Sequence, residues 1–517
     1  MKKRNLLIAV FMIVALASVW AGGGGQQAAT TGGLMDINVV AVHWAPYPIP
    51  AENSIIFKTI EQKKNVRFNF DWRQSTDYNT QLSVLLASGT LPDLLYPGAI
   101  SETVSLKDEG AIIELDGLLE KNGRNIIGAV GPNRMSGWRQ VDGHIYTITG
   151  ILDIEGAYSW MIRKDWLDKL NLREPSTWNE WLTVWRALRD NDVRGDRTPV
   201  VPLAFEGTQS SALSPLMWAF GIYSSPDAQF CVYNGRYMPV YEHPRYLDFL
   251  RTAANLYREG IVDQEFSTRT SNDLYTLMDS GRAASTMTWA ERASISTTTN
   301  RGAGDSAALW KTLAPPKGPN GDQGIQPRDW RQTSLSVTTA AQKAGKAERI
   351  IQFFDWLYGA EGIELFSYGA AGETFDYVSG KPVLKPALYS DGFVSYRSAG
   401  LQYAPFVGIW TEDAYMQVLN RGSTYDQLPV QVQSFYDGLF TVNKGHYYNL
   451  PETLGTEALN RYRAELISNG VNVLRARAIA GQITVDEFNA QYQALKPRGF
   501  QQIIDQGAAA YAAKSSR

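Results

Sequence analysis

The amino-acid sequence predicts an α/β protein of more than one domain that ends in a pair of helices. Strand-like and helix-like segments alternate between residues 36 and 96, and the last forty residues have helical periodicity. The length of 517 residues exceeds the roughly 100–200 of an ordinary domain. Hydrophobic residues make up 44% and charged residues 20% of the chain, a balance that excludes wholesale disorder and a polytopic membrane protein.

A strand–helix–strand pattern opens the folded part of the chain. Residues 37–42 form a short apolar run typical of a buried strand, and a helix is expected over 55–63. Residues 66–72 alternate between apolar and polar, the period of a second strand. A helix over 77–87 and a strand over 91–96 follow. We therefore expect a parallel sheet, with ligands bound beyond the carboxyl ends of its strands.

Helices dominate the later parts of the chain. Thr177 and Glu180 have the spacing of a capping box, and the apolar residues that follow them, tryptophans included, recur at helical spacing. We interpret these tryptophans as core and give them no ligand role. Further helices are expected over 246–258 and 344–358, in most of the chain after residue 428, and in a closing pair after residue 479; a polar strand is expected over 333–339.

The N-terminus has the pattern of an export signal. Residues 1–21 combine a basic start, a short apolar run and the small residue Ala21, which predicts a signal peptide; an uncleaved anchor is the alternative. Residues 22–35, rich in glycine, are expected to form a flexible linker. No cysteine lies near the predicted cleavage site, so we expect a periplasmic or extracellular protein that is secreted and not lipidated.

Charge and cysteine content exclude several classes of protein. The formal net charge is −3, so nothing favours nucleic acid or an anionic membrane as a partner. Cys231 is the single cysteine, which excludes an intramolecular disulfide and a cysteine-cluster metal site, and we expect it to be a core thiol. The 60 aromatic residues (15 Trp, 26 Tyr, 19 Phe) suit a large core and a protein that grips flat, amphipathic ligands.

Several segments together resemble one protein family over nearly all of the chain after the signal. They are WMIRKDWLDKLNL at 160–172 with the P-x-T-W-x-E-W pattern after it, LLASGTLPDL at 85–94, DGHIY at 142–146, GRAA at 281–284 followed by MTW, and YGAAGETF at 368–375. This ordered set resembles the extracellular solute-binding proteins, family 1, the large sugar-binding receptors of bacterial ABC importers. Thr149 departs from the pattern, since proline is usual there.

The resemblance implies the periplasmic-binding-protein type II fold: two α/β lobes, a hinge, an interlobe cleft and C-terminal helices. The expected parts are 36–150 plus 290–335 (lobe I), 151–289 plus 336–430 (lobe II) and 431–517 (C-terminal helical region), with crossings near 150–155, 286–290 and 333–337. It also implies a monomer that captures a mono- or oligosaccharide and delivers it to the transmembrane permease subunits, with no cofactor.

Candidate ligand contacts are aromatic and hydrogen-bonding residues that the expected fold brings to the cleft. A sugar presents apolar faces to aromatic rings and a rim of hydroxyls to polar groups. The candidates are Trp44, Tyr47, Asp93, Tyr96, Trp218, Trp289, Glu291, Arg328, Trp330, Tyr368, Glu373 and Trp410. For Trp218, whose surroundings in the sequence are apolar, core packing is an equal alternative.

A calcium loop that many larger members carry is degraded in this sequence. Asp190, Asp192 and Asp196 remain as oxygen ligands, but Arg194 brings a positive charge among them. Calcium takes about six to eight oxygen ligands, so we expect a solvated turn and no bound metal, with calcium at these three aspartates as the alternative.

No catalytic motif stands out in the sequence. The four histidines have no zinc-binding spacing, and neither a nucleophile elbow nor a phosphate loop occurs. A binding protein is therefore expected, not an enzyme. Two alternatives stay open: a peptide or other small solute bound by the same fold, and a glycan hydrolase that would need two carboxylates about 5–10 Å apart.

Overall fold

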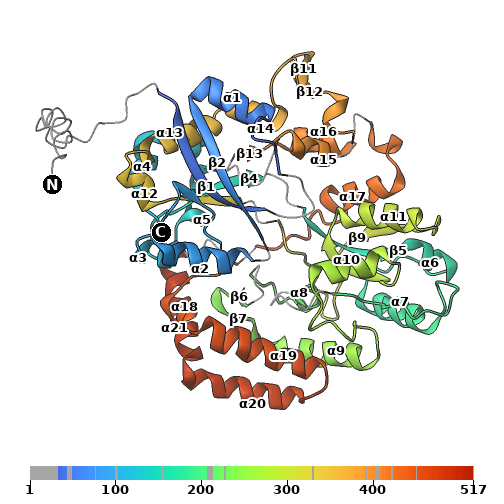
Figure 1. The fold of residues 1–517 in the computed structure, drawn as a ribbon. Coiled ribbons are helices and arrows are strands. Elements are labelled where there is room, and N and C mark those ends of the chain that lie inside the picture. The colour runs from blue at the N-terminus through green and yellow to red at the C-terminus, as the bar shows by residue number, and fades with distance from the viewer. Residues whose placement is uncertain are drawn as a thin grey trace, which may run out of the picture.

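The computed structural model describes most of the chain beyond its N-terminal segment (Figure 1). The described residues are 33–43, 49–75, 77–98, 103–152, 156–205, 213–225, 229–328, 331–390, 393–401, 408–420, 423–449 and 451–515. The predicted signal peptide and most of the predicted linker lie outside these residues.

A six-stranded sheet organises the first lobe, in the order β13-β4-β10-β3-β1-β2. Strand β1 pairs in parallel with β2 and with β3, as the alternating N-terminal pattern predicts, whereas β10 runs antiparallel to both β3 and β4. The elements of this lobe are β1 (Met35–His43), α1 (Ile55–Lys64), β2 (Val66–Gln74), α2 (Tyr78–Ser88), β3 (Leu94–Leu95), α3 (Thr103–Asp108), α4 (Asp116–Asn122), α5 (Arg124–Trp138), β4 (Ile148–Leu152), β10 (Arg331–Val337), α12 (Thr339–Lys343), α13 (Ala347–Leu357), α14 (Ala360–Tyr368), β11 (Phe375–Val378), β12 (Lys381–Leu384), α15 (Phe393–Ser398), β13 (Ile409–Trp410) and α16 (Glu412–Asn420).

Both faces of this sheet are buried, which explains the unbroken apolar run in β1. Ile37, Val39 and Ala41 pack in the larger core, on the side of α13 and α14. Val40 and Val42 point to the opposite face, where α2 and α3 cover them. Strands buried on both faces lose the alternation that marks a half-exposed strand, as parallel sheets usually do.

A smaller sheet, β8-β5-β9, organises the second lobe. Trp160 and Ile162 of β5 face the largest core, and Met161 between them faces a small cluster under α10 and α11. The elements of this lobe are β5 (Tyr158–Arg163), α6 (Lys164–Lys169), α7 (Trp178–Asp190), α8 (Ser214–Trp218), β6 (Phe230–Tyr233), β7 (Arg236–Pro239), α9 (Tyr246–Arg258), α10 (Ser271–Asp279), β8 (Ser285–Trp289), α11 (Arg292–Gly302), β9 (Trp310–Leu313), α17 (Val430–Phe440), which packs on α11 and β9, α18 (Glu457–Tyr462), the π-helical turn η5 (Arg463–Val471), α19 (Asn472–Ile479), α20 (Val485–Leu495) and α21 (Phe500–Ser515). Within the described residues there are also four short 3₁₀ turns, η2 (Val240–Glu242), η3 (Pro386–Leu388), η4 (Tyr425–Gln427) and η6 (Lys496–Arg498).

The capping box and the tryptophan helix are confirmed in α7. The Thr177 hydroxyl accepts a hydrogen bond from the backbone N–H of Glu180, whose carboxylate accepts one from the Thr177 N–H. Trp181 and Trp185 are fully buried, with ring centres 5.3 Å apart, and Trp181 lies as close to Trp160 of β5. The tryptophans of this helix are therefore core residues.

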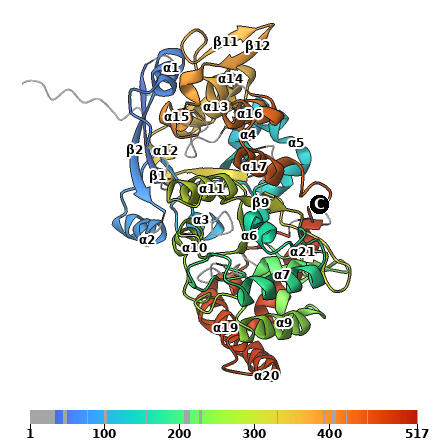
Figure 2. The same cartoon turned by 90° about the vertical axis from the view of Figure 1, so that its right-hand side faces the viewer.

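The C-terminal helices complete the second lobe (Figures 1 and 2). Helix α19 packs on α9, and α21 packs on α18 and β7. Phe488, Tyr492 and Phe500 from this region belong to the same core as the α7 tryptophans. The predicted closing pair of helices is thus present as α20 and α21.

The division of the chain between the two cores differs from the predicted lobe boundaries. Residues 336–430, expected in lobe II, pack with the first core, because β10 joins the first sheet and leads directly to α12 and α13 there. Residues 292–313, expected in lobe I, form α11 and β9 beside the second sheet. A strand that enters a sheet carries its following helix to the same sheet, and the sequence does not show which sheet each strand enters.

The chain passes between the cores at three places. The first passage follows β4 at Leu152, as expected. The second lies between Ile325 of the second core and Leu335 of the first. The crossing predicted at 333–337 falls within strand β10, so the observed passage begins a few residues earlier in the chain. The third lies between α16 and α17, because α17 packs on α11 and β9 of the second lobe. The crossing expected at 286–290 is instead strand β8 inside the second sheet.

Within the described ranges, none of the helices combines the length and the apolar character needed to cross a bilayer.

Candidate binding site

Six side chains from five separate segments meet beside the second passage, and we call them the crossing cluster. They are Tyr158 (β5), Trp289 and Glu291 (end of β8), Arg328 (before β10), Arg397 (α15) and Tyr415 (α16). Three of them, Trp289, Glu291 and Arg328, are among the residues predicted from the sequence. Both lobes contribute to the cluster, which is where a hinged protein would hold a ligand.

The aromatic part of the cluster is built on the second sheet. Tyr158 and Trp289 are directly opposed in the antiparallel pairing of β5 with β8, and their ring centres are 4.5 Å apart. The Arg328 guanidinium carbon lies 5.7 Å from the centre of the Trp289 ring, within cation–π range. Trp289 is nevertheless 36% exposed, unlike the core tryptophans. It therefore offers an aromatic surface that a ligand can cover.

The polar part of the cluster concentrates positive charge. Arg328 donates a hydrogen bond to the Tyr415 hydroxyl, and Glu291 and Arg397 lie within electrostatic range of both side chains. Loss of hydration lowers the pKa of the Arg328 guanidinium, and the neighbouring Arg397 lowers it further, while Glu291 opposes this. Burial raises the pKa of Tyr415, so its phenol stays neutral.

Asp93 is a structural residue, and its prediction as a ligand contact is wrong. Its Oδ2 accepts hydrogen bonds from the backbone N–H of Asn38 at 2.9 Å and from Lys346 Nζ at 2.8 Å, and the side chain is buried. Asp93 precedes β3, so it lies at the amino end of that strand. Ligands of parallel sheets bind at the opposite edge. The sequence placed Asp93 near the strand but could not show its ion pair with Lys346.

Two predicted aromatic contacts are also part of the cores. Trp218 is only 1% exposed and packs edge-on against Tyr448, so the core alternative is correct for it. Tyr368 is buried in the first core and donates a hydrogen bond to Asp413 Oδ2 at 2.7 Å. Neither ring is available to a ligand in this structure.

The remaining predicted residues lie away from the cluster or outside the described part. Tyr96 follows β3, and its carbonyl accepts a hydrogen bond from Tyr78, whose ring packs edge-on against it. Glu373 is exposed on the turn before the β11–β12 hairpin. In both views this hairpin lies at the outer end of the first lobe (Figures 1 and 2). Trp44, Tyr47, Trp330 and the side chain of Trp410 lie outside the described residues.

Sequence reasoning missed Tyr158, Arg397 and Tyr415. Tyr158 could have been found from strand pairing, because it stands opposite Trp289 across β5 and β8. Arg397 and Tyr415 come from short helices of the first lobe that no motif marks. Only the packing of that lobe against the second sheet brings them to Arg328.

The degraded calcium loop, expected to be a solvated turn, has other partners for its carboxylates. The Arg194 guanidinium pairs with Asp196, holding the pKa of that carboxyl down at about 2, and also donates to the carbonyls of Ser280 and Gly281. Asp192 accepts the N–H groups of Gly195 and Arg197. Asp190 pairs with Arg189. These carboxylates already accept hydrogen bonds from arginines and backbone N–H groups, so they do not fit a calcium ion, which takes about six to eight oxygen ligands.

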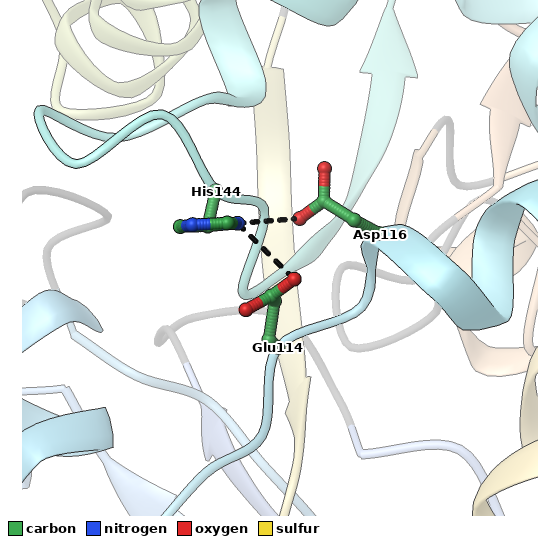
Figure 3. A group of neighbouring side chains, drawn as sticks. All are labelled: Glu114, Asp116 and His144. Atoms are coloured by element: carbon green, nitrogen blue, oxygen red, sulfur yellow. Dashed lines mark ion pairs between the residues drawn. The ribbon is translucent and has the colours of Figure 1, made fainter.

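A second group of possible metal ligands lies on the first lobe (Figure 3). His144 Nδ1 is 3.1 Å from Glu114 Oε1 and 3.5 Å from Asp116 Oδ2. Asp116 also accepts hydrogen bonds from the Ile145 N–H and from Arg139. Because an arginine already pairs with Asp116, the group is explained as an ion-pair network, and we assign no metal to it.

Two hollows on the surface of the protein lie away from the crossing cluster. One of about 450 Å³ borders α4 and α13, and the other, of about 400 Å³, lies between α5 and α21. Neither is lined by a residue of the crossing cluster.

Comparisons with known proteins give a consistent picture. The model of the family described as bacterial extracellular solute-binding protein matches residues 44–364, more than half of the chain. The lipoprotein LipO of Bacillus subtilis is 23% identical over 339 residues, which cover 64% of this chain and 66% of LipO. The fructooligosaccharide ABC transporter substrate-binding protein FusA of Streptococcus pneumoniae is 25% identical over 42% of this chain and 43% of its own length. The chain thus spans less than two thirds of either relative.

Solved structures extend the likeness to the whole fold. The alginate-binding protein AlgQ2, in a structure without calcium ion, has a TM-score of 0.72 at 20% identity, covering 93% of this chain and 99% of AlgQ2. FusA in complex with kestose has a TM-score of 0.69 at 17% identity, covering 93% of this chain and all of FusA. Another similar structure is that of a FusA EF-hand mutant in complex with fructo-nystose. The predicted fold class is confirmed.

Proposed function

Since the chain belongs to the family of bacterial extracellular solute-binding proteins, we propose that it captures a mono- or oligosaccharide between its two lobes and delivers it to the permease subunits of an ABC importer. The observation that carries the proposal is the exposed ring of Trp289 at the passage between the lobes, with Tyr158 and Arg328 around it. Kestose bound to FusA and the alginate of AlgQ2's name agree with a carbohydrate ligand.

Ligand binding at the crossing cluster uses complementary parts of a sugar. The exposed face of Trp289 accepts an apolar ring face by stacking. Glu291 accepts hydrogen bonds from hydroxyls, and Arg328 donates them. Because Arg397 and Tyr415 come from the first lobe and Trp289 from the second, a ligand that touches both groups favours the closed arrangement of the lobes.

The protein works as a receptor without catalysis and without a metal cofactor. A glycan hydrolase needs two carboxylates across the scissile bond, and the crossing cluster contains one, Glu291. The aspartates of the loop around residues 190–196 are held by arginines and backbone N–H groups, which supports a loop without a metal ion. The protein acts as a monomer outside the cytoplasm, exported by its signal peptide.

A peptide or another small solute is the alternative ligand. A peptide receptor would present separate groups for the two charged termini, whereas the crossing cluster combines aromatic rings with adjacent hydrogen-bonding groups. This arrangement favours a sugar.

A thermal-shift screen of the protein from Gly22 to Arg517 tests the proposal. A ligand at 100 times its Kd adds about 2.7 kcal/mol to the free energy of unfolding. We expect a dose-dependent rise in Tm with a carbohydrate class and none with amino acids or peptides. A rise only with peptides would overturn the sugar assignment, and time-dependent cleavage of a glycan would overturn the receptor assignment.

A further inference from the structure

We propose that Asn443 is a positioning residue of the ligand site. Its buried amide fixes the end of strand β5, from which Tyr158 supports Trp289, and so holds the indole in the orientation that stacks on a sugar. The inference rests on the proposed function and deepens it, because it names a residue that regulates affinity at the same site without touching the ligand.

The side-chain amide of Asn443 joins helix α17 to strand β5. Its Nδ2 group donates one hydrogen bond to the Tyr158 carbonyl and one to the carbonyl of Gly438, in the last turn of α17, each at 2.9 Å. An amide NH₂ group has two hydrogens to donate, and these bonds account for both. Asn443 has no exposed surface, so water does not compete for them. The amide is therefore a fixed link between the helix and the strand end.

Gly438 lets α17 lie directly against the strand ends that carry the two rings. A Cβ atom at this position would lie 2.9 Å from the Cβ of Ala290, the residue after Trp289. It would lie 3.3 Å from the Cβ of Ser159, the residue after Tyr158. The first distance is shorter than two carbon atoms in contact allow, so this approach requires glycine. The helix thus fixes the backbone on both sides of the ring pair.

The orientation of Trp289 depends on the strand pairing that these contacts hold. Tyr158 and Trp289 form the terminal pair of β5 with β8, and a backbone hydrogen bond from the Ala290 N–H to the Ala157 carbonyl, at 2.8 Å, lies beyond them. The ends of paired strands open more easily than their middles. A link to α17 at this end therefore keeps the ring centres 4.5 Å apart and the outer face of the indole open to a ligand.

The turn that contains Asn443 also reaches the passage that carries Arg328. The Asn443 carbonyl accepts the N–H of His446, whose own carbonyl accepts the N–H of Ile325 at 2.9 Å. Arg328 lies three residues after Ile325 in the chain. One turn thus supports both the strand end beside Trp289 and the segment that leads to Arg328.

Isothermal titration of a double-variant cycle tests the inference. The titrant is kestose first, and then the saccharide that raises Tm most in the thermal-shift screen. We expect Asn443→Ala to weaken binding roughly tenfold, because the indole is no longer pre-organised. Since Asn443 acts through the indole, Asn443→Ala should weaken binding by less than about twofold further when Trp289→Ala is already present.

Ser434→Ala is the matched control, because it removes another buried hydrogen bond of α17. The Ser434 hydroxyl accepts the N–H of Thr312 at 2.9 Å, on strand β9, which lies on the other side of β5 from β8. The variant should lower Tm, as Asn443→Ala does, and leave saccharide affinity within a factor of about two. If Asn443→Ala does not fold, Asn443→Ser, which keeps a short polar side chain, takes its place in the cycle.

Oxidation by N-bromosuccinimide reports on the indole without a ligand. Trp289 is 36% exposed, and mass spectrometry of its peptide measures its rate of oxidation in the folded protein. Loosening of the strand end in Asn443→Ala should raise this rate at least about threefold. The half-buried Trp356 of the first lobe is the internal reference, and its rate should not change.

The outcomes separate the inference from the function on which it rests. Affinity within a factor of two of the parent in Asn443→Ala, an additive loss in the double variant, or an unchanged oxidation rate of Trp289 would overturn the inference and leave the receptor function standing. Normal binding by Trp289→Ala would do the same, since Asn443 acts through that ring. Binding of no carbohydrate in either the titrations or the thermal screen would overturn both.

Discussion

Tyr158 and Trp289 face each other across the antiparallel pairing of β5 with β8, with ring centres 4.5 Å apart. The pairing fixes the indole at the end of a sheet strand, and the 36% of Trp289 that stays exposed is turned away from the core. A ring held by a strand on one side and open on the other is pre-organised for stacking, because little side-chain entropy is lost when a ligand binds.

Trp289→Ala is therefore expected to weaken sugar binding about tenfold or more, equivalent to about 1.4 kcal/mol, with little change in Tm. Isothermal titration and thermal unfolding measure the two effects. Tyr377→Ala, which removes another exposed aromatic side chain on the β11–β12 hairpin, should leave affinity unchanged. If affinity stays within a factor of two in Trp289→Ala, the indole does not stack on the ligand.

For the buried tryptophans we expect the opposite: substitution should lower stability and leave sugar affinity unchanged. Trp181 packs against Trp160 and Trp185 with no exposed surface, so Trp181→Ala should lower the free energy of unfolding by about 3–5 kcal/mol. Denaturant unfolding measures this loss. The fraction that remains folded should bind sugar normally, and a loss of affinity in that fraction would show that α7 contributes to the site.

Because Arg194 pairs with the carboxylate of Asp196 in its loop, we expect the thermal stability of the protein not to depend on calcium. The Arg194 guanidinium holds Asp196 and the turn at Ser280 and Gly281, so millimolar calcium or a chelator should leave Tm unchanged. Arg194→Gln should lower Tm, because the loop then loses its ties to the turn before β8. A chelator-sensitive Tm in the unaltered protein would contradict a loop without a metal ion, and a calcium-dependent Tm only in Arg194→Gln would support it strongly.

The N-terminal elements could be predicted because their signals are local. The apolar run of β1, the alternation of β2 and the capping box at Thr177 each depend on a few neighbouring residues. The lobe to which each later segment belongs could not be predicted. It depends on which sheet β9 and β10 join, and contacts between residues far apart in the chain determine that.

The residues of the candidate site could likewise be predicted only where a local sequence pattern marks them. Trp289, Glu291 and Arg328 were found because they flank segments that resemble the family's crossing strands. Asp93 was mistaken for a contact because a lone carboxylate near a strand gives no sign of the lysine, 253 residues later, that pairs with it. Arg397 and Tyr415 were missed because short helices without a motif carry them.

The buried imidazole of His243 should make the free energy of unfolding depend on pH. Its ring is buried, its Nδ1 accepts the backbone N–H of Arg245 at 3.2 Å, and Tyr233 packs edge-on against it. Burial, and secondarily the charge of Arg245, lower the pKa of His243 to about 4, although Asp322 opposes the shift. The ring is therefore neutral in the folded protein at a pH where the unfolded chain, with a pKa near 6.5, binds a proton.

Since the unfolded state binds more protons between pH 6.5 and 4, stability should fall as the pH is lowered through this window and gain nothing from His243 above it. The loss is on the order of 3 kcal/mol at pH 4. Urea unfolding of the protein and of His243→Gln at pH 7.5, 5.5 and 4.5 measures it. The variant should lose less stability on acidification than the parent, because glutamine binds no proton in this range. His144→Gln, at an exposed histidine of the first lobe, is the control. Parallel losses in the parent and in His243→Gln would mean that other groups govern the acid sensitivity.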